Sequence, residues 1–187
     1  AGEVVERPAS VAKELLENAL DAGATAITVE VDGGGVQRLR VVDNGHGMSL
    51  EDVTLAFQRH ATSKLTEAAD LNHIATLGFR GEALPSIASV SKVSVRTREP
   101  EELGAHRLRI EGGRLVETTQ AAGPVGTEFI VEDLFYNVPA RRKFLKTTAT
   151  EASHIQETVQ RLALCYPEVA FRLIKEGRTA IDFPRHD

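Results

Sequence analysis

Three consecutive glycines, Gly33 to Gly35, stand between two stretches of alternating apolar residues. Before them, Ile27, Val29 and Val31 alternate with polar neighbours, and after them residues 36–43 run back as a second extended stretch. A period of two is typical of strands with one buried face, and glycines permit the tight reversal between them. The pattern predicts a β-hairpin. Because a hairpin pairs its strands antiparallel, the chain cannot fold around an all-parallel sheet.

Helical and extended patterns follow one another along the chain. Apolar spacing and helix-start residues such as Pro8 and Ser49 predict helices over Pro8 to Ala22, Ser49 to about Arg59, Glu82 to Val90 and Glu151 to Leu164. Alternation predicts further strands over Lys92 to Thr97, His106 to Ile110, Arg114 to Thr118, Thr127 to Glu132, Val169 to Ile174 and Thr179 to Phe183. These elements predict an α/β (α+β) two-layer sandwich, with a mixed, mostly antiparallel sheet and helices on one face.

Composition restricts the class of protein. A length of 187 residues suits one domain over residues 1–187, and no apolar run approaches the length of a membrane span. A net charge of -5 means that any contact with DNA must be local. The single cysteine, Cys165, cannot form an intramolecular disulfide and lies in an apolar run that predicts a core position. With no visible signal peptide, the cytoplasm is the expected compartment.

Glu14, Asn18 and Asp21 occupy positions i, i+4 and i+7 of the first predicted helix. At roughly 100° per residue, this spacing places the three side chains within an arc of about 60°. A solvated helix face is one interpretation of such a stripe. The functional interpretation makes Asn18 an oxygen ligand of Mg²⁺ and Glu14 the carboxylate that polarises an attacking water.

Asp43 ends an apolar strand on the same face as Leu39 and Val41, so its carboxylate is expected to be partly buried. A buried charge requires hydrogen-bond donors, and the exocyclic amino group of adenine is such a donor, whereas guanine presents a carbonyl there. Gly45 and Gly47 would let a flat base approach the backbone. The alternative is an ordinary Asp-Asn-Gly turn.

Residues 78–84 form a glycine-flanked stretch that leads into a predicted helix. Gly78 and Gly81 allow the backbone to bend, Arg80 carries positive charge, and the first N–H groups of a helix bind anions. The stretch is typical of a phosphate loop, with a flexible surface loop as the alternative. Thr62, Ser63 and Lys64 add hydroxyl and ammonium donors upstream and are predicted to contact the nucleotide from a lid.

Other site types are absent from the sequence. There is no Gly-x-x-x-x-Gly-Lys-Ser/Thr sequence and no dinucleotide-binding glycine pattern, so a nucleotide site must be of another type. The six histidines lack the spacing of zinc ligands. The clearest basic cluster is Arg141 to Lys143 with Lys146, for which a solvated face and a DNA contact are both open.

Four segments follow the order of the GHKL ATP site: the helix with Glu14 and Asn18, the Asp43-Asn-Gly-His-Gly47 turn, the Gly78–Leu84 loop, and Gly126-Thr127. Five more specific stretches span nearly the whole chain: Gly2–Pro8, Asp21–Thr25, Arg59–Lys64, Gly78–Leu84 and Leu134–Phe144. With these residues the chain resembles the MutL mismatch-repair family of GHKL ATPases, rather than gyrase, histidine kinases or heat-shock chaperones.

The resemblance implies the Bergerat (GHKL) ATP-binding fold, with ATP and Mg²⁺ as cofactors. By the same resemblance, Glu14 is the general base, Asn18 the Mg²⁺ ligand and Asp43 the carboxylate that recognises adenine. The full set of predicted nucleotide-binding residues is Asn18, Asp21, Asp43, Gly45, Gly47, Met48, Thr62, Ser63, Lys64, Gly78, Phe79, Arg80, Gly81, Glu82, Ala83, Leu84 and Thr127.

The resemblance also implies an ATP-gated dimeric clamp that couples mismatch recognition to downstream repair. Its expected partners are a second copy of the chain, MutS-type mismatch-recognition proteins, other repair proteins, and DNA contacted without regard to sequence. No membrane association is expected, and a bacterial protein would be cytoplasmic and nucleoid-associated. The chain is expected to be a fragment that lacks the extreme N-terminal arm, the following transducer domain and the C-terminal dimerisation region. The alternative function is a nucleotide-gated dimerisation or DNA-binding module with little or no hydrolysis.

Overall fold

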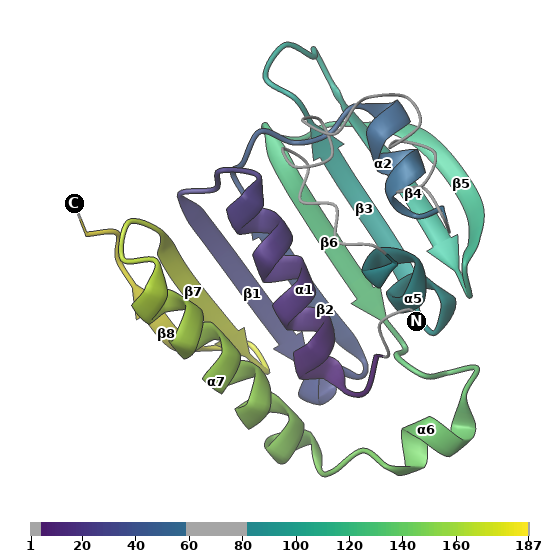
Figure 1. The fold of residues 1–187 in the computed structure, drawn as a ribbon, viewed down its shortest axis with the longest axis vertical. Coiled ribbons are helices and arrows are strands. Elements are labelled where there is room, and N and C mark those ends of the chain that lie inside the picture. Colours follow the sequence, from purple (N-terminus) through teal and green to yellow (C-terminus); the bar gives the residue numbers. More distant parts are fainter. Residues whose placement is uncertain (1–4, 59–81, 187) are drawn as a thin grey trace.

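A computed structural model of the chain describes residues 5–58 and 82–186 (Figure 1). Within these residues the strands are β1 (Ala26–Asp32), β2 (Arg38–Asp43), β3 (Lys92–Arg98), β4 (Ala105–Glu111), β5 (Arg114–Ala121), β6 (Gly126–Glu132), β7 (Ala170–Lys175) and β8 (Arg178–Phe183). They form one sheet in the order β5-β4-β3-β6-β2-β1-β7-β8. All neighbours pair antiparallel except β1 and β7, which run parallel.

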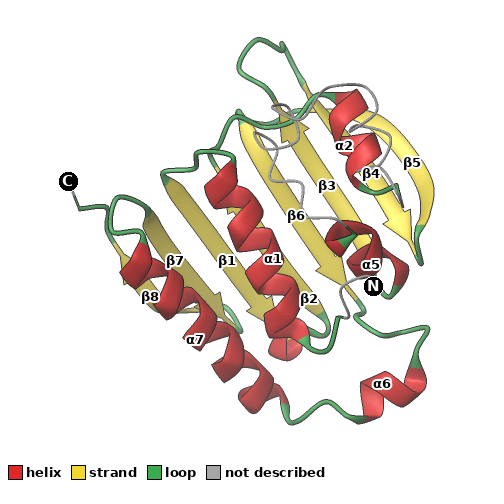
Figure 2. Ribbon diagram, viewed as in Figure 1, coloured by secondary structure: helices red, strands yellow, loops and turns green. Residues whose placement is uncertain are grey.

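The described helices are α1 (Pro8–Asp21), the 3-10 turn η1 (Gly33–Gly35), α2 (Leu50–Ala56), α5 (Ala83–Ser89), α6 (Pro139–Lys143) and α7 (Thr148–Cys165). Figure 2 shows α1, α2, α5 and α7 on the same face of the sheet. The core lies between this helical layer and the inward-facing side chains of the strands. The predicted two-layer architecture with a mixed, mostly antiparallel sheet is therefore confirmed.

Helix α1 packs across the middle of the sheet. Pro8 opens it at a position where a missing backbone N–H is tolerated, and Gly23 follows its end with φ at +75°. Val11, Leu15 and Ala19 are among the buried residues of the face that meets the strands. Because the buried stripe occupies one side only, Glu14 and Asn18 remain half-buried beside it.

The predicted hairpin is present as β1 and β2, with Ile27 opposite Asp43. Its glycine turn is packed against helix α7, because a Cβ on Gly34 would lie 2.8 Å from the carbonyl oxygen of Thr148. The turn therefore needs glycine both for its positive φ and for this close approach. Val36 still has helical backbone angles at the end of this turn, so β2 begins at Arg38 rather than at residue 36.

Two of the differences from the sequence expectations concern helix α7. Helix α7 begins before the predicted Glu151, because Thr147 caps it by accepting the N–H of Thr150 at 3.2 Å. The prediction that Cys165 lies in the core is wrong, since this residue is exposed. At about 100° per residue, Cys165 lies about 100° around α7 from the stripe formed by Ile155 and Val159 and so falls outside it.

Within residues 5–58 and 82–186, none of the helices has the length and apolar character required to cross a membrane.

Candidate functional site

Three polar side chains lie in a row across the centre of the sheet. Asp43 of β2 is opposite Thr127 of β6, and Thr127 is in turn opposite Thr97 of β3. All three belong to the helix-covered face and are buried, with exposed fractions of 8%, 5% and 1%. Buried polar groups require partners, so this row is the most distinctive polar feature of the inner sheet face.

The Asp43 carboxylate is the charged member of the row. Burial raises its pKa from 3.8 to about 6, and this effect exceeds the opposing one of the backbone N–H groups of Gly45 and Thr127 and of His46. The Gly45 N–H donates to Oδ1 at 2.8 Å. Since these donors do not offset the loss of water, the ionised carboxylate can still gain from a further donor.

Glycines bring the backbone close to Asp43 on both sides. A Cβ on Gly45 would meet the Ala22 carbonyl oxygen at 2.7 Å, and a Cβ on Gly126 would meet the Asp43 carbonyl oxygen at 2.1 Å. On Gly47, whose φ is +70°, a Cβ would lie 2.0 Å from the carbonyl oxygen of Arg98. These glycines are thus required by contacts within the protein itself, in addition to the predicted space for a base.

The loop after β2 is attached to the end of α1. The N–H of His46 donates to the carbonyl oxygen of Ala22 at 3.0 Å, and the Asn44 side chain accepts from the N–H of Thr25 at 2.8 Å. This anchoring places the predicted turn beside the helix that bears Glu14 and Asn18. These hydrogen bonds hold the turn against the end of the helix, as a preorganised site requires.

The three predicted residues of α1 differ in exposure. Glu14 and Asn18 are half-buried, and the Oε2 atom of Glu14 is shielded from solvent. Asp21 is exposed at the end of the helix. Glu14 and Asn18 therefore fit a protected site better than Asp21 does.

The predicted phosphate loop is described only from its last residues onward. Glu82 occupies the position before α5, Ala83 is buried in the first turn, and Leu84 packs partly against the core. The other predicted residues of the lid and loop lie outside the described residues: Thr62, Ser63, Lys64, Gly78, Phe79, Arg80 and Gly81.

Met48 and Thr97 are connected in a way that the sequence interpretation missed. The Met48 N–H donates to Oγ1 of Thr97 at 2.9 Å, which attaches the loop after β2 to strand β3. The available signal was the alternation in residues 92–98, where Thr97 shares the inward face with Val93 and Val95. A hydroxyl at an inward strand position indicates a polar contact in the core.

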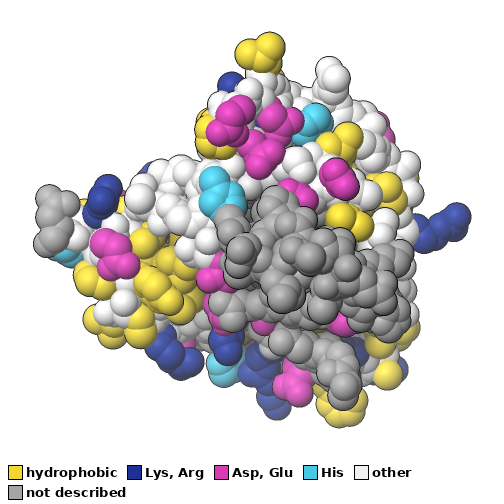
Figure 3. Space-filling view, turned by 45° about the horizontal axis from the view of Figure 1, so that its top comes forward, with side chains coloured by type: hydrophobic (Ala, Val, Ile, Leu, Met, Phe, Trp, Pro, Cys, Tyr) yellow, Lys and Arg dark blue, Asp and Glu magenta, His cyan; other side chains and the backbone are white. Residues whose placement is uncertain are grey.

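An acidic surface borders this region. Figure 3 shows Asp and Glu side chains gathered beside a histidine at the end of the molecule where β3 and β4 connect. Burial raises the pKa of Glu99, and the nearby carboxylates of Glu102, Asp52 and Glu101 raise it further. This concentration of negative charge disfavours a phosphate group there. A triphosphate entering the site is therefore expected to extend away from it, along α1 and towards the start of α5.

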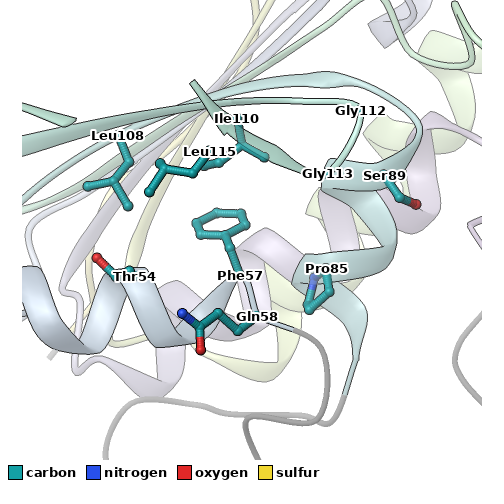
Figure 4. A pocket seen from close by; sticks show the side chains of 10 residues that line it. All are labelled: Thr54, Phe57, Gln58, Pro85, Ser89, Leu108, Ile110, Gly112, Gly113 and Leu115. Carbon is teal, nitrogen blue, oxygen red and sulfur yellow. The ribbon is translucent and has the colours of Figure 1, made fainter. Parts of the chain in front are cut away.

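A separate pocket of about 400 Å³ opens between α2, α5 and the β4–β5 hairpin. In Figure 4 the ring of Phe57 points into it, facing Leu108 and Leu115. It is lined by Thr54, Phe57, Gln58, Pro85, Ser89, Leu108, Ile110, Gly112, Gly113 and Leu115. No ionisable side chain is among these, so this pocket lacks the carboxylates expected of the nucleotide site.

The donor set fits Mg²⁺ held mainly by water and phosphate. Among residues 5–58 and 82–186, no three His, Cys, Asp or Glu side chains gather in a manner that could hold a metal ion. Mg²⁺ commonly takes only one or two protein oxygens and keeps its other ligands from water and phosphate. The half-buried amide of Asn18 suits that role, and Glu14 lies one helical turn before it.

This arrangement can bind a flat, amine-bearing ring at the sheet and an anion beside the helices. Asp43 offers a hydrogen-bond acceptor at the row of polar side chains, while α1 offers an amide oxygen and a shielded carboxylate. An acceptor for a base amine and a carboxylate that can orient a water are two of the groups that recognition and hydrolysis of a nucleoside triphosphate require.

Comparison with known proteins agrees with this chemistry. Residues 6–123 match the family described as histidine kinase-, DNA gyrase B- and HSP90-like ATPases. The chain is 55% identical to the DNA mismatch repair protein MutL of Desulforamulus reducens over 98% of its own length and 29% of that protein. It is 60% identical to MutL of Symbiobacterium thermophilum over 92% of its length and 27% of that protein. The chain thus spans less than a third of these curated relatives.

Solved structures show the same fold. The Aquifex aeolicus MutL ATPase domain complexed with ADP matches with a TM-score of 0.80 and 38% identity, over 98% of this chain and 66% of that one. The N-terminal domain of a DNA repair protein matches with a TM-score of 0.82 and 28% identity, over 98% and 55% of the two chains.

Proposed function

Because the chain belongs to the family of histidine kinase-, DNA gyrase B- and HSP90-like ATPases and is a MutL-type ATPase domain within it, we propose that it binds ATP and hydrolyses it to ADP and phosphate with Mg²⁺. The reaction serves DNA mismatch repair. The observation that supports this proposal most directly is the buried Asp43 carboxylate, which lies opposite Thr127 and whose pKa is raised to about 6.

Asp43 acts in recognition of the base. Its ionised form accepts a hydrogen bond from the exocyclic amine of adenine, which replaces the water that the carboxylate lost on folding. A guanine base would direct a carbonyl oxygen at the same carboxylate, leaving two acceptors face to face. Selectivity for adenine follows from this mismatch of acceptors.

Glu14 acts in hydrolysis. Its shielded carboxylate orients the attacking water and accepts a proton from it as the bond to the terminal phosphate breaks. Asn18 would hold Mg²⁺, which when bound neutralises charge on the phosphate oxygens. The N–H groups at the start of α5, together with Arg80 and the lid residues Thr62 to Lys64, are proposed to bind the phosphates.

A titration with four nucleotides tests this function. Isothermal titration calorimetry with ADP, ATP, GDP and GTP, each with Mg²⁺, is expected to give binding of the adenine nucleotides only. Phosphate release from ATP, measured in parallel, tests hydrolysis. Equal affinity for guanine nucleotides, or no uptake of any of the four, would overturn the proposed site.

The role of the whole protein is a proposal that extends beyond this chain, which covers 29% of a curated relative. Nucleotide binding is proposed to drive homodimerisation, and the dimer to act as a clamp that engages MutS-type and other repair proteins on DNA. The exposed side chains of Arg142, Lys143 and Lys146 provide local positive charge that suits sequence-independent contact with DNA. A cytoplasmic, nucleoid-associated location would follow for a bacterial protein.

The alternative is a nucleotide-gated interaction module that hydrolyses little ATP as an isolated chain. Light scattering with and without a non-hydrolysable ATP analogue measures dimerisation, and the phosphate-release assay measures turnover. Dimerisation without turnover favours the alternative. Turnover by the chain alone favours the ATPase function.

A further inference from the structure

Thr97 is a buried residue that lies behind the proposed base-binding site. Its side chain is 1% exposed, so it cannot touch a ligand itself. It contacts two elements that can: its Oγ1 lies 2.8 Å from Oγ1 of Thr127 and accepts the N–H of Met48 at 2.9 Å. Both neighbours are predicted nucleotide-binding residues.

The Thr97 hydroxyl has one proton and two possible acceptors. It can donate to the carbonyl oxygen of Gly126 at 3.3 Å or to the hydroxyl of Thr127 at 2.8 Å. If it donates to Gly126, Thr127 donates to Thr97 and presents only lone pairs to the site. If it donates to Thr127, the Thr127 proton is available to the site. The direction of this hydrogen bond therefore sets what Thr127 offers to a ligand.

Thr127 is also directly connected to the base-reading carboxylate. Its backbone N–H donates to Asp43, which it faces across the β2–β6 pair. Thr127 thus lies between Thr97, whose hydroxyl sets its hydrogen bonding, and the carboxylate of Asp43. A contact that restricts the Thr127 side chain before binding preorganises the site, because less rotational freedom is then lost on binding.

We propose that Thr97 is a positioning residue for adenine-nucleotide recognition, acting through the hydroxyl of Thr127 and the backbone N–H of Met48. This inference rests on the proposed function, since it concerns the same site. It separates two layers of the site: Asp43 and Thr127 face the ligand, and Thr97 fixes the orientation of Thr127 and the position of the loop that contains Met48.

The test compares Thr97→Val with Thr97→Ser by titration calorimetry with ADP. Valine keeps the shape of threonine but removes the hydroxyl, so the affinity is expected to fall about tenfold. Serine keeps the hydroxyl, and its affinity is expected to stay within about threefold of the wild type. Loss of affinity in Thr97→Ser equal to that in Thr97→Val would show that the hydroxyl is not responsible and would overturn the proposal.

Ser91→Ala is a matched control for loss of a buried hydroxyl. Ser91 is 0% exposed and donates to the carbonyl oxygen of Ile87 at 2.6 Å, so its replacement removes a buried hydrogen bond outside the proposed site. It is expected to lower the thermal midpoint while leaving the ADP affinity unchanged. A similar drop in affinity for Ser91→Ala and Thr97→Val would assign the effect of Thr97 to general destabilisation and overturn its positioning role.

A double-mutant cycle tests whether Thr97 acts through Thr127. In the Thr127→Val background, Thr97→Val is expected to lower ADP affinity less than it does in the wild type, because the contact with Thr127 is already gone and only the contact with the Met48 N–H remains to be lost. An equal loss in both backgrounds would overturn the inference. Failure of the proposed function would give a different result, because the wild-type chain itself would then bind no ADP. That result would overturn this inference as well.

Discussion

Oδ1 of Asp43 accepts a hydrogen bond from the N–H of Gly45 at 2.8 Å, so the turn that follows strand β2 folds back onto the carboxylate that ends it. A second backbone donor, the N–H of Thr127, comes from the neighbouring strand. Even with both, burial keeps the pKa raised to about 6. At neutral pH the free protein therefore contains an ionised Asp43 carboxylate that is less stable than it would be in water. This is expected of a carboxylate that accepts a further hydrogen bond when a ligand binds.

Asp43→Asn is expected to stabilise the free protein above pH 6. A rise in pKa from 3.8 to about 6 corresponds to about 3 kcal/mol in favour of the neutral side chain. Asparagine is neutral at every pH and keeps an oxygen that can accept the Gly45 N–H. Urea unfolding at pH 8 is therefore expected to give a larger free energy of unfolding for the variant than for the wild type.

The pH dependence of that difference provides the check. Below pH 3.8 the wild-type carboxyl is neutral in both folded and unfolded chains, so Asp43 carries no penalty. As the pH rises through about 6, Asp43 ionises in the folded protein and its destabilising effect becomes complete. The stability advantage of the variant should thus grow between about pH 4 and pH 6 and then level off. An advantage that is constant with pH would contradict the assignment.

The same Asp43→Asn variant should lose adenine recognition. An amide oxygen accepts a weaker hydrogen bond than a carboxylate, and the amide nitrogen would present a donor to the base amine. ADP affinity is expected to fall by about 10- to 100-fold, as for loss of a hydrogen bond to a charged group. A variant that is more stable and binds as well as the wild type would show that Asp43 has no part in recognition.

Glu14→Ala is expected to separate binding from turnover. Because Glu14 orients the water mainly in the transition state, ATP hydrolysis should fall by about 10²- to 10⁴-fold while ADP affinity changes little. Phosphate release and titration calorimetry on the same preparation measure the two quantities. Equal losses in binding and rate would place Glu14 in ground-state binding instead.

Asn18→Ala is expected to remove the advantage that Mg²⁺ gives to nucleotide binding. The amide oxygen is the proposed protein ligand, and without it the ion is held by phosphates and water alone. ATP titrations with Mg²⁺ and with EDTA are expected to differ strongly for the wild type and little for the variant. If the variant retains the full Mg²⁺ dependence, Asn18 is not the ligand.

Gly126→Ala and Gly177→Ala separate close packing from backbone strain. Both glycines have positive φ, +128° and +77°. A Cβ on Gly126 would lie 2.1 Å from the Asp43 carbonyl oxygen, whereas nothing lies within 4 Å of a Cβ on Gly177. Gly177→Ala should therefore cost about 1 to 2 kcal/mol in urea unfolding, and Gly126→Ala more than about 3 kcal/mol. Similar losses would mean that the contact at Gly126 relaxes easily.

Local pattern was sufficient to predict most of the fold. Pro8 and Gly23 bounded helix α1, and Ser49 was correctly expected to cap α2, where its hydroxyl accepts the N–H of Asp52 at 3.1 Å. Alternation identified the strands, because each buries one face only. The parallel pairing of β1 with β7 was not foreseen. Such a pairing depends on where the chain returns to the sheet after helix α7, and the local alternation of apolar residues carries no information about that.

The site was predicted in part. Burial of Asp43 was expected from its position on the face of Leu39 and Val41, and the structure confirms it. The glycine contacts with Ala22 and Arg98, and the hydrogen bonds of Thr97, depend on which strands become neighbours. Sequence could show that Thr97 faces inward, but its partners are set by tertiary structure.

Strand β6 lies between β2 and β3 in the sheet, although β3, β4 and β5 all precede it in the chain. Asp43 meets Thr127 only when this late strand inserts between two earlier ones. Closing so long a loop is slow, and a nascent chain cannot complete the row until residues beyond 126 have left the ribosome. A nucleotide bound at Asp43 would therefore stabilise only those chains in which strand β6 has paired with β2 and β3.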